Sequence, residues 1–172
     1  MSEADTCRKL VVPKLLAVGW DTDPHSIAEQ RTITDGRIVP VGKGFVRKPP
    51  KRVDFLLRYT RDFPLAVVEA KANYKAAADG VQQAKTYAEM LGLKFAYATN
   101  GHEIIEIDYT TGLERNVPGY PAPAELWARY RQAKGISDPA QAERLLTPFN
   151  HAVGKGERYY QQIAINVRSR VP

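Results

Sequence analysis

Apolar side chains recur at helical spacing in two long segments of the chain. In residues 3–18 they fall every three or four positions, and Gly19 follows where such a helix would stop. Pro13 interrupts this pattern, which predicts a kinked or split helix. Residues 79–93 show the same periodicity and contain Gly92 near their end, so they predict a second amphipathic helix.

Five shorter segments have the composition of β-strands. They either alternate apolar and polar residues or form short apolar runs of the kind that is buried on both faces of a sheet. Their ranges are 28–34, 53–59, 65–68, 95–99 and 103–109. Asn100-Gly101 favours a hairpin between the last two strands. The order of helix, strands, helix and strands predicts an α/β fold in which helices flank a central mixed β-sheet.

The character of the sequence changes beyond about residue 114. Three prolines fall between residues 118 and 123, as is typical of a linker. Short helices are expected over 123–133, 140–146 and 157–167. We therefore expect one domain over residues 1–135 and a separate segment over residues 136–172.

Length and composition narrow the class of protein. The 172 residues suffice for one globular domain, and no run approaches the roughly 20 apolar residues that span a bilayer. The first residues are acidic, unlike those of a secretory signal, and Cys7 has no second cysteine with which to pair. These features predict a cytoplasmic protein that has no membrane segment.

Positive charge is in excess, with a net charge of +6, and part of it crowds one segment around Pro49-Pro50. The basic residues of this segment are Lys43, Arg47, Lys48, Lys51 and Arg52. The segment is either a solvated loop or a rim that contacts phosphate groups. It lies just before the residues that are the best candidates for catalysis, so we keep the second interpretation.

That candidate is a pair of carboxylates on two predicted strands. Asp54 lies in the first strand, and Glu69 follows at the end of the next, so a short connection would bring both to one end of the sheet. Paired carboxylates suit Mg²⁺ or Mn²⁺, and the backbone carbonyl of Ala70 is a further candidate ligand. Lys71 lies two residues beyond Glu69, on the same face of a strand, where its ammonium could orient a water molecule or stabilise a phosphate. The structural alternative is a salt bridge between Asp54 and Lys71 at the edge of the core.

These residues belong to a longer series of segments whose joint order is more specific than any one of them. The series comprises Glu3-Ala4-Asp5-Thr6, Ala17-Val18-Gly19-Trp20, Ala28-Glu29-Gln30, Thr34-Asp35-Gly36-Arg37-Ile38, Arg52-Val53-Asp54-Phe55, Val68-Glu69-Ala70-Lys71, the segment from Gly80 to Ala88, and Thr99-Asn100-Gly101. With it the chain resembles the PD-(D/E)xK nuclease superfamily, and more narrowly the N-terminal endonuclease domain of the motor (R) subunit of type I restriction enzymes. The resemblance covers roughly residues 1–135 and implies a restriction-endonuclease-like core.

The resemblance implies roles for individual residues. Asp54 and Glu69 would bind the metal, and Lys71 would support catalysis. The family's Q-x-x-x-Y motif falls on Gln83 and Tyr87, which share one helix face and would lie near the active site. The alternative for this pair is a surface glutamine and a core tyrosine.

Two positions of the resemblance are less regular. Glu3 matches an acidic position of the first helix that adds to the metal site in related nucleases, although a solvated carboxylate at a helix start would look the same. Val53 stands where the motif has a proline directly before the aspartate, a departure that is common in the superfamily.

The segment from Glu157 to Ile165 resembles the start of a superfamily 2 helicase motor, in which a glutamine contacts adenine. Gln161 is the better match for that glutamine and Gln162 the alternative. No G-x-x-x-x-G-K-[ST] motif occurs, so ATP would be a cofactor only of a full-length protein. Residues 136–172 are accordingly interpreted as a linker and the start of a truncated motor, in an expression fragment or a natural truncation.

The sequence thus predicts a metal-dependent endonuclease domain that cuts double-stranded DNA within a restriction complex. Its partners would be the specificity and methylation subunits, and cleavage could require them and the motor. The alternative function is a DNA-binding or assembly module with a degenerate site. His25, His102 and His151 are scattered and have no metal-ligand spacing, so no histidine chemistry is expected.

Overall fold

The computed structural model describes residues 1–34, 38–41, 44–47 and 49–147. The predicted helix over 157–167, with Gln161 and Gln162, lies outside this range, as do Lys43 and Lys48 of the basic segment.

A six-stranded mixed sheet forms the centre of the molecule, with the strand order β1-β4-β5-β6-β7-β8. The strands are β1 (Ser26–Ile33), β4 (Lys51–Thr60), β5 (Phe63–Ala70), β6 (Phe95–Thr99), β7 (Ile104–Asp108) and β8 (Leu113–Asn116). The pair β5 and β6 is parallel, and the other neighbours are antiparallel. The predicted α/β fold with a mixed sheet is confirmed, including all five predicted strands.

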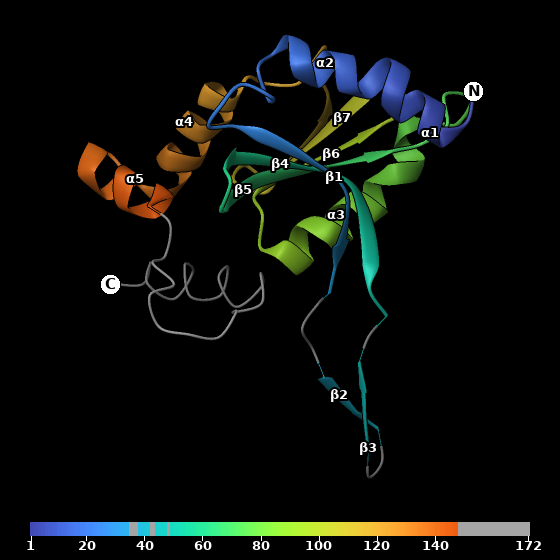
Figure 1. The fold of residues 1–172 in the computed structure, drawn as a ribbon, viewed down its shortest axis with the longest axis horizontal. Helices are drawn as coiled ribbons and strands as arrows, with labels where there is room; N and C mark the ends of the chain where they lie inside the picture. The colour runs from blue at the N-terminus through green and yellow to red at the C-terminus, as the bar shows by residue number, and fades with distance from the viewer. Residues whose placement is uncertain (35–37, 42–43, 48, 148–172) are drawn as a thin grey trace.

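Helices cover both faces of this sheet (Figure 1). On one face lies a continuous helical segment made of α1 (Glu3–Thr6), the π-helix η1 (Cys7–Val11) and α2 (Val12–Ala17). On the other lies α3 (Val81–Leu91), preceded by the 3₁₀-helix η2 (Ala77–Gly80). The irregularity that Pro13 predicts is present as a change from π-helix to α-helix next to this residue, within a segment that stays helical. Proline has no N–H to donate to the preceding turn, so it fits at the start of α2 and not in the middle of a regular helix.

Alternate residues of the central strands belong to two apolar cores, one on each face. Phe55, Phe95 and Tyr97 pack on the side of the first helix. Leu56, Val67 and Ala96 pack on the side of α3. Because both faces are covered, the central strands can be apolar at every position, which explains the uninterrupted run over 65–68.

Four elements were missed by the sequence analysis. The hairpin of β2 (Ile38–Val41) and β3 (Gly44–Arg47) projects away from the sheet between β1 and β4 (Figure 1). The basic segment is therefore not a loop throughout, since Arg47 ends β3 and the exposed Lys51 and Arg52 begin β4. The strand β8 is exposed along its length and has no apolar alternation to reveal it, and η2 is a single short turn.

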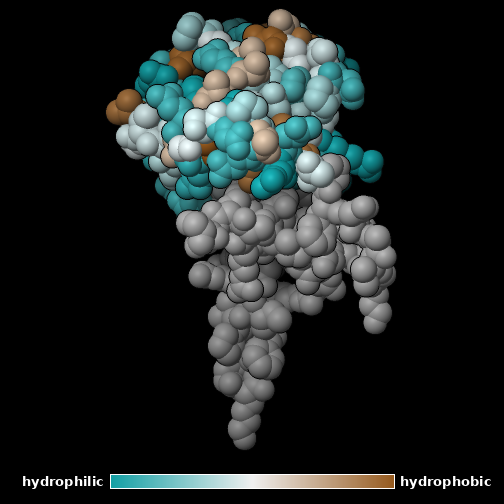
Figure 2. All heavy atoms as spheres, turned by 90° about the vertical axis from the view of Figure 1, so that its left-hand side faces the viewer, coloured by the Kyte–Doolittle hydropathy of each residue, from teal (hydrophilic) through white to brown (hydrophobic). Residues whose placement is uncertain are grey.

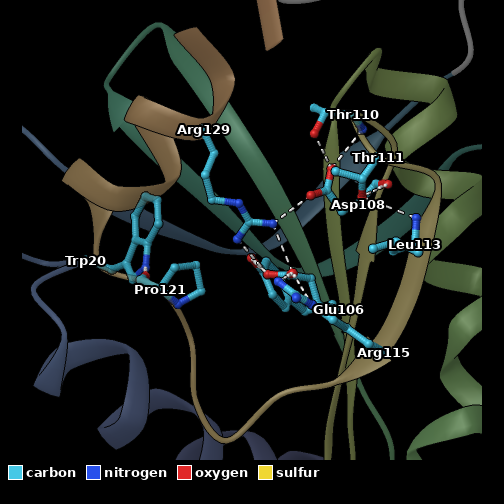
Figure 3. Close-up of polar contacts among 10 residues, drawn as sticks. Trp20, Glu106, Asp108, Thr110, Thr111, Leu113, Arg115, Pro121 and Arg129 are labelled. Atoms are coloured by element: carbon cyan, nitrogen blue, oxygen red, sulfur yellow. Dashed lines mark hydrogen bonds and ion pairs between the residues drawn. The ribbon is translucent and has the colours of Figure 1, made fainter. Parts of the chain in front are cut away.

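Helices α4 (Pro123–Lys134) and α5 (Pro139–Leu146) follow the sheet, close to the predicted ranges. Arg129 of α4 donates to both oxygens of Glu106 at 2.9 Å each and to Asp108 at 2.8 Å, which fastens the helix to β7 (Figure 3). Burial alone would raise the pKa of Glu106, but the hydrogen bonds from Arg129 and Tyr97 outweigh it and lower the pKa. Trp20 adds a hydrogen bond to the carbonyl of Pro121 at 3.0 Å.

The surface beside α4 and α5 is mainly hydrophilic. Figure 2 shows apolar residues scattered over this face rather than gathered into one patch. Within the described ranges, no helix has both the length and the apolar character needed to cross a membrane.

Candidate metal centre

Asp54 and Glu69 lie side by side on neighbouring antiparallel strands. Phe55 of β4 pairs with Val68 of β5. Because the strands are antiparallel, Asp54, which precedes Phe55, lies across from Glu69, which follows Val68. Both share the face of Leu56 and Val67, toward α3. Asp54 is 8% exposed and Glu69 only 2%, so two acidic side chains are nearly removed from water. The structure therefore brings the two carboxylates together at one end of the sheet, as the sequence predicted.

A third carboxylate comes from the first turn of α1. One oxygen each of Glu3, Asp54 and Glu69 lie within 4.8 Å of one another. Glu3 itself is exposed, and Ser2 caps the start of its helix. The first helix thus supplies an acidic group to a site whose other members are in the sheet.

The two oxygens of Asp54 each accept one hydrogen bond. The side chain of Gln30 donates to Oδ1 and the backbone N–H of Ala70 donates to Oδ2, both at 2.9 Å. The carboxylate is therefore fixed from the strand on either side, β1 and β5. The position of the Ala70 carbonyl as a metal ligand stays a prediction.

Only one of the two carboxylate oxygens of Glu69 has a hydrogen-bond partner. Its Oε1 accepts a hydrogen bond from Lys71 at 2.9 Å, but Oε2 is buried and has no hydrogen-bond partner. Burial, followed by repulsion from Asp54 and Glu3, raises the pKa of Glu69 to about 7, although Lys71 opposes the shift. A buried carboxylate oxygen without a partner is costly, and a cation between the carboxylates would remove that cost.

Lys71 begins a series of side-chain hydrogen bonds that ends at Tyr87 in α3. Its Nζ donates to Oε1 of Gln83 at 2.8 Å, and Nε2 of Gln83 donates to the hydroxyl of Tyr87 at 2.7 Å. Gln83 is therefore more than a surface residue, and Tyr87 combines a buried ring with a polar contact. Lys71 forms its ion pair with Glu69. Among the residues that the structure describes, the alternative salt bridge between Asp54 and Lys71 is not formed.

Burial alone would lower the pKa of Lys71, but the hydrogen bond to Glu69 and the surrounding carboxylates raise it above 10.5. The side chain is consequently an ammonium at neutral pH. It can donate hydrogen bonds and stabilise negative charge, but it has no lone pair with which to accept a proton.

Sequence reasoning gave no role to two residues that contact the site. Gln30 occurs in the resemblance, but it lies on a different strand from Asp54, and no spacing rule connects the two. Gly80 lies where an added Cβ would be 3.5 Å from Cγ of Lys71 and 3.6 Å from Cγ of Glu69. The turn that leads into α3 therefore rests directly on these two side chains, which only the folded arrangement reveals.

Comparison with known proteins shows what the chain is similar to. No protein-family model matches the chain. The type I restriction enzyme EcoAI endonuclease subunit of Escherichia coli is 36% identical over 96% of this chain. A solved structure described as a fragment of an HsdR subunit of a type I restriction enzyme, from Vibrio vulnificus YJ016, is 52% identical over 99% of this chain, with a TM-score of 0.85.

The chain is a homologue of part of the type I restriction endonuclease subunit. It spans 21% of the Escherichia coli protein and 32% of the Vibrio vulnificus chain. The resemblance drawn from the motifs is confirmed, and so is the restriction-endonuclease-like fold. The division at residues 135 and 136 stays a prediction, as does the cytoplasmic location.

Proposed function

We propose that this domain hydrolyses DNA phosphodiester bonds with the help of a divalent cation, Mg²⁺ or Mn²⁺. The observation that carries the proposal is the convergence of Glu3, Asp54 and Glu69, with one oxygen of Glu69 buried and unpartnered. Oxygen ligands in this number suit a hard cation that keeps some of its water and takes phosphate oxygens as further ligands. The family relationship independently favours nuclease chemistry.

Each side chain has a defined part in the proposed reaction. Glu3, Asp54 and Glu69 hold the cation, whose chemistry when bound is to lower the pKa of a water ligand and to neutralise phosphate charge. Asp54 is held by two donors and so keeps a fixed orientation. Lys71 donates to the phosphate or to the attacking water and stabilises the charge that develops on phosphorus oxygens.

Gln83 and Tyr87 position this lysine. The carboxamide of Gln83 accepts from Lys71 on one side and donates to Tyr87 on the other. Because Lys71 has four rotatable side-chain bonds, two fixed acceptors, on Glu69 and Gln83, restrict where its ammonium can lie.

The proposed substrate is double-stranded DNA, and the proposed partners are the specificity and methylation subunits of a restriction complex. This substrate and these partners are proposed from the similarity to type I restriction endonuclease subunits, of whose length the chain covers only a part. ATP would act in the longer subunit through the motor, with Gln161 as the adenine contact; that residue lies outside the described range.

The test is metal-dependent nicking of plasmid DNA by the full-length subunit assembled with its partners. Asp54→Asn, Glu69→Gln and Lys71→Met should each lower the nicking rate by about 100-fold or more, because each removes charge from the reacting centre. Asp62→Asn is the matched control, since Asp62 is exposed and lies in the turn at the opposite end of β4 and β5.

Two results would contradict the proposal. One is nicking by Asp54→Asn or Glu69→Gln at the rate of the Asp62→Asn control. The other is tight DNA binding with no heat of magnesium binding at millimolar concentrations, which would favour the DNA-binding or assembly module instead.

A further inference from the structure

Gln30 has an unusual backbone conformation. Its φ is +50°, and no other residue except glycine has a positive φ in the described part of the chain. It lies inside β1, where an extended conformation is the rule. Side chains that carry a Cβ avoid the left-handed region, and glutamine lacks the short polar side chain that helps asparagine there. Such a conformation persists only where surrounding contacts hold it.

The contacts around Gln30 lead to Asp54. Glu29 pairs with Phe55 and Arg31 with Val53, so Gln30 lies across from Asp54 on the neighbouring strand. The side-chain amide of Gln30 donates to Oδ1 of Asp54 at 2.9 Å. Nε of Arg52 donates to the Gln30 carbonyl at 3.3 Å. The left-handed residue is therefore tied to β4 through both its backbone and its side chain.

The consequence falls on the Asp54 carboxylate. With Oδ2 held by the N–H of Ala70, the Gln30 amide supplies the donor for Oδ1, and the carboxylate cannot rotate without breaking one of the two bonds. Donors that orient a metal-binding carboxylate in this way also influence the affinity of the site.

We propose that Gln30 is a positioning residue of the metal centre, which sets the orientation of Asp54 toward the point shared with Glu3 and Glu69. This inference rests on the proposed function, because it requires that a cation binds there. The competing explanation is that the hydrogen bond only pins the edge strand β1 to β4.

The test measures Mn²⁺ binding to the 172-residue chain by calorimetry, together with the thermal unfolding midpoint. Gln30→Met keeps the length of the side chain but removes the donor. Gln30→Gly removes the donor and also relieves the left-handed backbone. Thr32→Ala is the control for a change at an exposed position of the same strand.

We expect both Gln30 variants to bind Mn²⁺ about tenfold more weakly than the wild type, while Thr32→Ala binds as the wild type does. The unfolding midpoints of the two Gln30 variants should stay close to that of Thr32→Ala. Wild-type affinity in both Gln30 variants would overturn the inference and leave the proposed function standing. Weaker binding accompanied by a midpoint well below that of Thr32→Ala would also overturn it, in favour of the strand-pinning role. Absence of Mn²⁺ binding by the wild type would overturn the proposed function and this inference together.

Discussion

Glu69 is a buried carboxylate that is only partly hydrogen-bonded. Its Oε1 is paired with Lys71, whereas Oε2 is buried and unpartnered. With a pKa of about 7, a cation at the proposed site would compete with a proton for this carboxylate near neutral pH.

The raised pKa predicts how the stability of the metal-free protein depends on pH. Because the pKa rises from 4.5 to about 7 on folding, the folded state binds the proton more tightly than the unfolded state. The contribution of Glu69 to the free energy of unfolding is therefore fully present below pH 4.5 and is lost as the pH rises through about 7. Relative to Glu69→Gln, the wild type should lose stability between these values in urea unfolding with a chelator, and Mg²⁺ should restore it at the higher pH.

Glu106 provides a control of opposite sign. Its pKa is lowered from 4.5, so its contribution is present above that pH and is lost as the pH falls. The difference between wild type and Glu106→Gln should accordingly shift in the acidic range. A difference between wild type and Glu69→Gln that does not change with pH would contradict the burial argument.

The contact between the first helix and the β6–β7 hairpin depends on one glycine. Gly101 has a φ of +91°, and a Cβ added there would lie 2.6 Å from Cδ1 and 2.8 Å from Cβ of Leu10. Lys14 also donates to the Gly101 carbonyl at 2.6 Å. This close approach helps to place the helix that carries Glu3.

Gly101→Ala should therefore lower the free energy of unfolding by about 2–4 kcal/mol in total. This loss is larger than the one that backbone strain alone would cause. Gly112→Ala separates the two causes, because Gly112 has a φ of +73° but no atom within 4 Å of an added Cβ. Chemical denaturation of both variants gives the comparison. Equal losses would show that the contact with Leu10 contributes nothing.

The elements that the sequence predicts well are those that are buried. The apolar run over 65–68 and the periodic segment over 79–93 identify β5 and α3 because burial dictates their residues. The hairpin of β2 and β3 projects from the sheet and forms a separate two-stranded sheet. The strand β8 is exposed at all four positions and carries no apolar pattern. Exposed strands are determined by pairing with neighbours, which the sequence of the segment alone does not express.

At the scale of the whole molecule, the candidate site joins elements from both faces of the sheet. Glu3 comes from α1, Asp54 and Glu69 come from β4 and β5, and the chain from Lys71 ends on α3. The two strand carboxylates could be predicted because neighbouring strands of an antiparallel pair bring such residues together. The family resemblance supplied Glu3, Gln83 and Tyr87.

Other contacts of the site could not be predicted from the sequence. The hydrogen bond from Gln30 comes from a residue in a left-handed conformation, which no residue pattern indicates. The unpartnered oxygen of Glu69 and the closeness of Gly80 to the side chains of Glu69 and Lys71 are visible only in the folded structure. Such contacts depend on tertiary packing rather than on local sequence.

The most direct test of the metal centre is a crystal of the chain soaked in Mn²⁺ and measured by anomalous diffraction. The structure predicts one anomalous peak among Glu3, Asp54 and Glu69, about 2 Å from an oxygen of each strand carboxylate. A well-ordered crystal at high Mn²⁺ concentration with no peak between Asp54 and Glu69 would contradict the account.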